Sequence, residues 1–248
     1  HCESSAASDV YKRQALKNPQ RPCIAVVGGI KVADSISVAD NMLRKGIADE
    51  IWATGGVANL LVELSGIDIG NINHSFLVKE LGKEYHSTVE TAKALLNDFH
   101  EQIHLPTDLA ANVEDNRVDL SVEELPIDAP LFDMGINSIM ALSSAIKNAG
   151  TIILNGPAGV FEVEDFALGT IEMLNACAES NGYVVVGGGH TATLIMNRGL
   201  TDKMGHLSTG GGACLDYMAG RILPGIASLE ISAEKFFMDV QEASNKMD

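Results

Sequence analysis

Short apolar runs alternate along the chain with longer stretches in which apolar positions recur at helical spacing. The short runs are rich in Val and Ile and predict strands at Cys23–Val27, Ile51–Ala53, Leu131–Asp133, Thr151–Leu154 and Tyr183–Val186. The longer stretches predict helices at Ser35–Gly46, Val57–Leu64, Ser87–Ile103, Ser138–Asn148, Asp165–Ser180, Thr191–Arg198 and Ala213–Met218.

Strands that alternate with helices are typical of parallel βαβ units with helices on both faces of the sheet. The strands are apolar almost throughout, as a sheet covered on both sides requires. The sequence therefore predicts an α/β fold, a three-layer α/β/α Rossmann-like lobe with a mainly parallel sheet of about six strands. The acidic stretch from Asn112 to Pro130 is irregular and is expected to be a solvated excursion with a short edge strand.

The two ends of the chain differ from the middle. Residues 1–14 show no apolar periodicity and lack the apolar segment of a secretory signal, so we expect a non-native leader. Residues 15–225 are expected to form the lobe, and residues 226–248 a C-terminal tail with a helix over Ala233–Ala243.

Composition narrows the classes of function. Seventeen Lys and Arg stand against 33 Asp and Glu, a net charge of −16, which disfavours a basic nucleic-acid-binding face. No uninterrupted apolar run approaches the ~20 residues of a membrane span. The four cysteines form no CxxC pair and are expected to be free thiols in a reducing, cytoplasmic setting.

Glycine-rich corners follow several of the predicted strands. They are Gly28-Gly29, Gly55-Gly56, Asn155-Gly156-Pro157-Ala158-Gly159, Gly187-Gly188-Gly189 and, before the last core helix, Gly210-Gly211-Gly212. A single Gly-Gly pair before a helix is most often only a tight turn. In a parallel sheet, however, these corners would meet at the carboxyl edge, where open α/β folds bind ligands. Backbone amides converging there predict a phosphate site.

Familiar phosphate motifs do not explain these corners. The chain has no GxxxxGK[ST], which excludes a P-loop. It also lacks a GxGxxG fingerprint with an acidic residue ~20 positions on, which disfavours a dinucleotide-dependent oxidoreductase.

The corners and their flanks closely resemble the C-terminal, nucleotide-binding lobe of phosphoglycerate kinase. The resemblance is to the archaeal type of this family, and this chain resembles an N-terminally truncated member. The matching stretches occur in family order over roughly residues 15–225: Asn18-Pro19-Gln20-Arg21-Pro22, Gly28-Gly29-Ile30-Lys31-Val32, Thr54-Gly55-Gly56-Val57-Ala58, Asp133-Met134-Gly135, Asn155-Gly156-Pro157-Ala158-Gly159-Val160-Phe161-Glu162, Gly187-Gly188-Gly189-His190-Thr191, Ser208-Thr209-Gly210-Gly211-Gly212 and Leu223-Pro224-Gly225.

The resemblance implies phosphoryl transfer between 1,3-bisphosphoglycerate and ADP, with Mg²⁺ on the nucleotide. It implies an adenine pocket lined by Gly29, Gly55, Gly56, Phe132 and Val160, with Glu162 on the ribose. It places Asn155, Gly188, Gly189 and Thr191 at the nucleotide phosphates, and Lys31 with Gly210, Gly211 and Gly212 at the transferred phosphoryl group.

Two positions depart from the bacterial and eukaryotic pattern. Ser35 stands where those enzymes carry a second lysine, and His190 where they carry a metal-binding aspartate. Imidazole is a poor ligand for Mg²⁺, so the residues that hold the metal stay open, and we expect His190 to bond a phosphate oxygen instead.

The resemblance also implies a partner lobe that binds 3-phosphoglycerate on a basic patch, and nothing in this sequence resembles that patch. The chain begins within what resembles the interlobe helix, so we expect it to bind ATP or ADP and to be inactive alone.

Two other functions stay open at this point. One is a stand-alone, non-catalytic nucleotide-binding α/β domain, which the same glycine corners would serve. The other is a zinc protease, because His100-Glu101-Gln102-Ile103-His104 is an HExxH sequence. Pro106 follows too closely for a helix to run through both histidines, so we expect coincidence.

Overall fold

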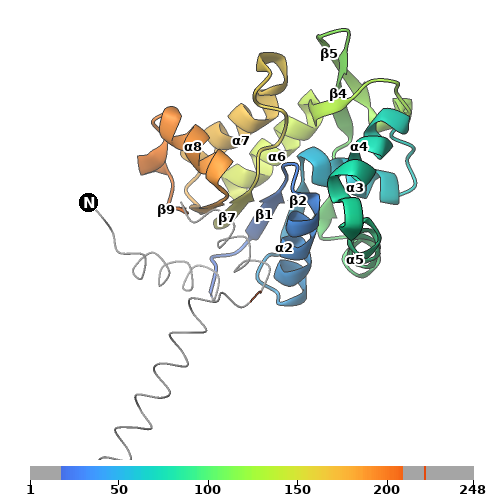
Figure 1. Ribbon diagram of the computed structural model, residues 1–248. Helices are drawn as coiled ribbons and strands as arrows, with labels where there is room; N and C mark the ends of the chain where they lie inside the picture. The colour runs from blue at the N-terminus through green and yellow to red at the C-terminus, as the bar shows by residue number, and fades with distance from the viewer. Residues whose placement is uncertain (1–17, 209–220, 222–248) are drawn as a thin grey trace, which may run out of the picture.

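The computed structural model describes residues 18–208 and residue 221. Its main sheet has six strands in the order β3-β2-β1-β7-β8-β9, and every neighbouring pair is parallel (Figure 1). The strands are β1 (Cys23–Val27), β2 (Glu50–Ala53), β3 (Ile103–His104), β7 (Thr151–Asn155), β8 (Tyr183–Gly187) and β9 (His206–Leu207). The predicted α/β fold with about six mainly parallel strands is confirmed.

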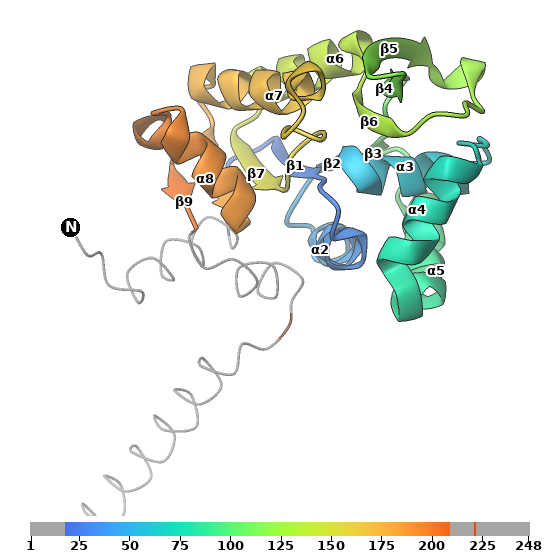
Figure 2. The same cartoon turned by 45° about the horizontal axis from the view of Figure 1, so that its top comes forward.

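Helices cover both faces of this sheet (Figure 2). One face carries α2 (Val32–Arg44), α3 (Gly55–Leu64) and α5 (Tyr85–Asp98), and the other carries α6 (Ile136–Asn148), α7 (Leu168–Glu179) and α8 (Gly189–Asn197). The central strand β1 supplies both cores, because successive side chains of a strand point to opposite faces. Ala25 and Val27 pack with α2, whereas Ile24 and Val26 pack with α6 and α7.

The register of the sheet sets four strand ends level with one another. Val27 of β1 pairs with Ala53 of β2 and with Asn155 of β7, and Asn155 pairs with Gly187 of β8. The glycine corners that follow these strands therefore lie in a row along one edge of the sheet.

A second, antiparallel sheet has the order β5-β4-β6, with β4 (Asp108–Val113), β5 (Asn116–Ser121) and β6 (Leu131–Met134). The expected strand at Leu131–Asp133 forms, but its place among the parallel strands was wrong, because it pairs with β4. Most of the expected excursion from Asn112 is likewise ordered: β5 is its exposed edge strand, joined to β4 through Glu114 and Asp115 at positive φ.

Helix α4 (Asn71–Leu81) was not predicted. Its apolar positions are too irregular to mark a helix, and a buried side chain fixes it instead. Asn73 donates through Nδ2 to the carbonyls of Ile69 (2.8 Å) and Ala129 (3.1 Å), and its Oδ1 accepts from the amide of Leu131 (2.8 Å). This clamp ties α4 to the segment that leads into β6.

Predicted helix ends differ from the observed ones in two ways. Helix α5 ends at Asp98, not Ile103, because the chain turns through Phe99 to place Ile103 beside β2. The starts of the helices also differ by two or three residues: α2, α3, α5, α6 and α8 begin earlier than expected, whereas α7 begins later, at Leu168 instead of Asp165, because Glu164–Phe166 forms a separate 3₁₀ turn. Short 3₁₀ helices complete the described elements at Gly82–Glu84 (η1), Val122–Glu124 (η2), Glu164–Phe166 (η3) and Thr201–Lys203 (η4).

The expected leader 1–14, the helices at Ala213–Met218 and Ala233–Ala243, and the tail 226–248 lie outside the described residues. Within 18–208, no helix has the length and apolar character that crossing a membrane would need.

Candidate functional site

A pocket of about 640 Å³ opens at the carboxyl ends of β1, β2, β7 and β8. This volume is typical of small-molecule sites. The twelve described residues that the sequence singled out all line it: Gly29, Lys31, Gly55, Gly56, Phe132, Asn155, Val160, Glu162, Gly188, Gly189, His190 and Thr191. Gly210, Gly211 and Gly212 lie outside the described residues.

Three of the glycine corners pack directly against one another. The amide of Gly28 donates to the carbonyl of Asn155 (2.7 Å), that of Gly29 to Pro157 (3.0 Å), and that of Gly55 to Ala158 (3.0 Å). A Cβ on Gly28 would collide with the hydroxyl of Thr54. The glycines are therefore needed for backbone contact. For Gly28, Gly29, Gly55 and Gly56 the expectation of free amides was wrong, because carbonyls of the chain already accept these amides.

The fourth corner, at the start of α8, is different. Gly188 has φ 96°, and a Cβ built on Gly188 or Gly189 would meet no atom within 4 Å. The first turn of a helix leaves its amides without intrahelical acceptors and carries the positive end of the helix dipole. Thr191 is 1% exposed, and among the described residues its hydroxyl has no hydrogen-bond partner. Amides and an orphaned hydroxyl that line a pocket fit an anionic ligand.

Lys31 and Asn155 complete the polar part of the pocket. Lys31 is exposed immediately before α2 and forms no ion pair with the described part of the chain. Asn155 is buried at the end of β7, where its Nδ2 donates to Ser35 (3.2 Å). The Ser35 hydroxyl in turn donates to the carbonyl of Gly28 (3.2 Å). Ser35 therefore holds Asn155 in place.

The opposite part of the pocket is apolar. Phe132 of β6 and Val160 line it, and the amide of Val160 donates to the carbonyl of Phe132 (2.8 Å). Helix α4 adds Ile72 and Phe76, which are 41% and 45% exposed. Sequence reasoning missed these two residues because it missed their helix. Glu162 is exposed at the pocket and could accept hydrogen bonds from hydroxyl groups.

The described residues do not fit a metal held by protein side chains. They contain no group of three His, Cys, Asp or Glu that could bind an ion. Asp34, in the first turn of α2, already pairs with Arg221 (3.0 Å). In the HExxH sequence, His100 follows the end of α5 and His104 lies on β3, so the two histidines do not share a helix as a zinc protease requires.

Comparison with known proteins gives the family. The model of the phosphoglycerate kinase family matches residues 9–221, which is most of the chain. The chain belongs to the phosphoglycerate kinase family. The resemblance found in its glycine corners is confirmed at this level.

Relatives in the phosphoglycerate kinase family support the assignment. "Phosphoglycerate kinase 2" of Methanosarcina acetivorans is 43% identical over 224 residues, which cover 90% of this chain and 53% of the relative. The phosphoglycerate kinase of Methanobacterium bryantii is 44% identical and covers 85% of this chain and 50% of the relative. The chain thus spans about half the length of these curated relatives.

Solved structures of phosphoglycerate kinases share its fold. The Pyrococcus horikoshii enzyme superposes with a TM-score of 0.82 at 35% identity and covers 93% of this chain, which corresponds to 56% of that enzyme. The Coxiella burnetii enzyme gives a TM-score of 0.74 at 34% identity, with coverage of 92% and 58%.

Proposed function

We propose that this chain is the nucleotide-binding, C-terminal lobe of a phosphoglycerate kinase, beginning in the interlobe helix and extending over residues 15–225. Together with the other half of such an enzyme it would transfer a phosphoryl group between 1,3-bisphosphoglycerate and ADP, in glycolysis and gluconeogenesis. The observation that carries the proposal is that one pocket is lined by all twelve described residues that the resemblance assigned to nucleotide binding.

The chemistry of the lining suggests how ADP or ATP lies in the pocket. The amides at the start of α8 and the Thr191 hydroxyl suit phosphate oxygens, and His190 adds a nitrogen donor beside them. Phe132 and Val160 offer apolar contact to the adenine. Glu162 would accept hydrogen bonds from the ribose hydroxyls.

Phosphoryl transfer asks the protein mainly for positioning and for stabilisation of charge on the transferred group. The exposed ammonium of Lys31 lies at the pocket and would meet the negative charge that develops on the phosphoryl oxygens. Asn155, held by Ser35, would orient the same group. Gly210, Gly211 and Gly212, which lie outside the described residues, are proposed to receive the phosphoryl group.

Magnesium bound to the nucleotide would neutralise part of the phosphate charge. Because the described residues supply no ligand set for it, we assign no protein ligand and derive no step through the metal.

The acceptor, 3-phosphoglycerate, is proposed to bind the half of the enzyme that this chain does not span. Closure of the two halves would exclude water and align the phosphoryl group. The 248-residue chain alone is therefore proposed to bind nucleotide without turning over substrate.

Calorimetric titration of the chain with ADP and Mg²⁺ tests the proposal. The Lys31→Met variant is expected to bind more weakly, since a cation beside the phosphates is lost. Lys45→Met is the matched control: Lys45 is an exposed lysine at the other end of the same helix, and it does not line the pocket. The absence of ADP binding by the unmodified chain, or equal affinities of the two variants, would contradict the proposal.

A further inference from the structure

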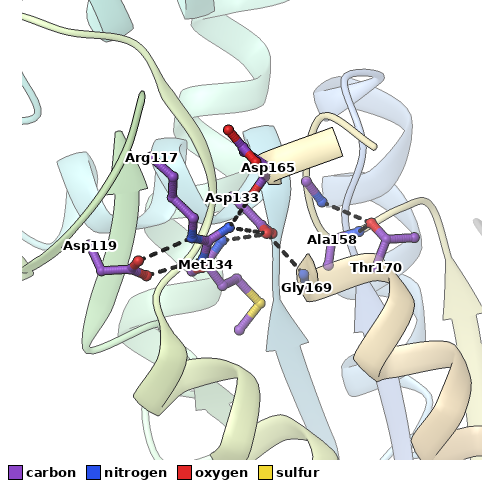
Figure 3. Close-up of polar contacts among 9 residues, drawn as sticks. Arg117, Asp119, Asp133, Met134, Ala158, Asp165, Gly169 and Thr170 are labelled. Carbon is purple, nitrogen blue, oxygen red and sulfur yellow. Dashed lines mark hydrogen bonds and ion pairs between the residues drawn. The ribbon is translucent and has the colours of Figure 1, made fainter. Parts of the chain in front are cut away.

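A buried ion pair lies behind Phe132 and Val160, the two residues that are called the apolar wall of the pocket below. Nη1 of Arg117, on β5, donates to Oδ2 of Asp133, on β6, at 2.9 Å (Figure 3). The side chain of Asp133 is 0% exposed and that of Arg117 is 13% exposed. The same guanidinium donates to the carbonyls of Met134 (2.7 Å) and Asp165 (3.0 Å), so one side chain joins three segments.

Asp133 in turn fixes the backbone around residues 156–162, which follow β7 and are called the pocket loop below. Its carboxylate accepts from the amides of Gly169 and Met134, each at 2.9 Å. A Cβ on Gly159 or on Gly169 would collide with this carboxylate. Burial raises the pKa of Asp133, and the Arg117 guanidinium with the two amides opposes that shift. The carboxylate therefore depends on its donors to remain charged in this position.

Thr170 holds the pocket loop itself. Its Oγ1 accepts from the amides of Ala158 (3.1 Å) and Gly159 (3.2 Å), as Figure 3 shows for Ala158. Thr170 is 1% exposed, so no water competes for these bonds. The residue that follows Gly159 is Val160, whose side chain lines the pocket.

Aromatic contacts connect Arg117 to Phe132, the second residue in the apolar part of the pocket. Cζ of Arg117 lies 5.9 Å from the ring centre of Phe166, and this buried ring meets Phe132 edge to face at 5.2 Å. Phe132 lines the pocket and accepts the backbone hydrogen bond of Val160. The two residues of the apolar wall, Phe132 and Val160, are thus placed through contacts with groups that do not themselves line the pocket.

We propose that Arg117, Asp133 and Thr170 are positioning residues for the base end of the nucleotide pocket. None of the three lines the pocket, so they act through Phe132 and Val160. The phosphate end is built separately, on α8, and within the described residues none of these three side chains forms a hydrogen bond, ion pair or ring contact with that helix. This inference rests on the proposed function, because it needs a nucleotide with its base at Phe132.

The separation of the two ends gives a test that a general loss of stability would not imitate. ADP uses both ends of the pocket, whereas inorganic tripolyphosphate can use only the phosphate end. Thr170→Val keeps the shape of the side chain and removes the acceptor, and Arg117→Lys keeps the charge but cannot reach all of the acceptors. For each variant we expect calorimetry to show an ADP affinity at least about fivefold lower and a tripolyphosphate affinity within about twofold of the unmodified chain.

Arg44→Lys is a matched control for Arg117→Lys. Arg117 pairs with Asp119 as well as Asp133. Arg44 likewise pairs with two aspartates, Asp40 and Asp98, and its guanidinium lies 5.5 Å from the ring centre of Phe99, yet it does not line the pocket. Its replacement is expected to leave both affinities unchanged.

Hydrogen exchange of the ligand-free chain supplies a second measurement for each variant. Faster exchange is expected in residues 156–162 and 130–134, with no change in residues 189–197. An unchanged ADP affinity in both variants, an equal loss for ADP and tripolyphosphate, or unchanged exchange in residues 156–162 would overturn the inference. If the unmodified chain bound no ADP, the proposed function itself would fail first, and that result is distinct from these.

Discussion

Individual side chains at the pocket divide into those with protein partners and those without. Asn155 is bonded to Ser35, whereas Lys31 and the Thr191 hydroxyl have no partner among the described residues. A buried hydroxyl without a partner costs free energy in the unliganded protein. A phosphate oxygen would satisfy it, so the Thr191 hydroxyl is expected to contact a phosphate of the nucleotide.

His190 gives a prediction at this scale. Its imidazole lines the pocket beside the first turn of α8 and is expected to donate one hydrogen bond to a nucleotide phosphate. His190→Ala should therefore weaken ADP binding about two- to tenfold in calorimetry, which corresponds to the ~0.5–1.5 kcal/mol of an ordinary hydrogen bond made by a solvent-exposed side chain. His86→Ala, an exposed histidine on α5, serves as the control. Unchanged ADP affinity in His190→Ala would remove this role.

The cysteines give a second residue-scale prediction. Cys23 and Cys177 are buried free thiols, and burial raises the pKa of each to about 12. At pH 8 a thiol of that pKa is ionised in about one molecule in ten thousand, and the thiolate is the reactive form. Iodoacetamide should label both only after denaturation, as read by peptide mass spectrometry. Rapid labelling of either in the native chain would show that its surroundings are not closed.

At the scale of elements, contacts between segments that are distant in sequence fix helix starts that the local sequence does not cap. Helix α6 begins after Gly135, which has no side chain to cap it, and Asp108 of β4 supplies the acceptors instead. Its carboxylate accepts from the amides of Asn137 (2.9 Å) and Ser138 (2.8 Å), which are two of the otherwise unbonded donors of the helix start. The antiparallel sheet is thereby joined to a helix of the main sheet.

Asp108→Ala should consequently destabilise the chain by about 1–2 kcal/mol, as the loss of a helix cap does. Chemical denaturation followed by circular dichroism measures the change. Asp128 is exposed and has no hydrogen bond or ion pair in the described structure, so Asp128→Ala should fall within about 0.5 kcal/mol of the unmodified chain. Equal effects of the two substitutions would refute the capping role.

Sequence pattern alone predicted the long buried strands, because Val and Ile runs such as Cys23–Val27 have few alternatives to the centre of a sheet. It did not predict β3 and β9, which are two residues long and exist through their neighbours. It also missed α4, which the Asn73 clamp stabilises. The glycine-rich motifs were enough to predict the polar half of the pocket. Ile72 and Phe76 could be assigned to the pocket only once the position of α4 in the fold was known.

For the whole molecule, the register of the parallel sheet is the organising feature. Level strand ends place four corners of the chain in one row, and three of them lock together through backbone hydrogen bonds. Among the corners that the structure describes, the start of α8 is then the one with first-turn amides to offer. The described part of the chain thus presents an apolar and backbone surface at one end of the pocket and, at the other, a helix start whose amides suit an anion.

The length of the chain leads to a prediction about activity. It spans about half of its phosphoglycerate kinase relatives, and the proposed acceptor site lies in the remainder. The purified 248-residue chain should show no ATP consumption with 3-phosphoglycerate above the background without acceptor. Measurable turnover by this chain would contradict the division of labour between the two halves.

Hydrogen–deuterium exchange with and without ADP and Mg²⁺ tests the central claim most directly. One ligand lying across the row of strand ends should slow exchange together in residues 28–33, 130–134, 155–162 and 188–193, and leave the β4–β5 hairpin unchanged. Protection confined to one of these segments, or absent from residues 188–193, would contradict a single nucleotide site with its phosphates at α8.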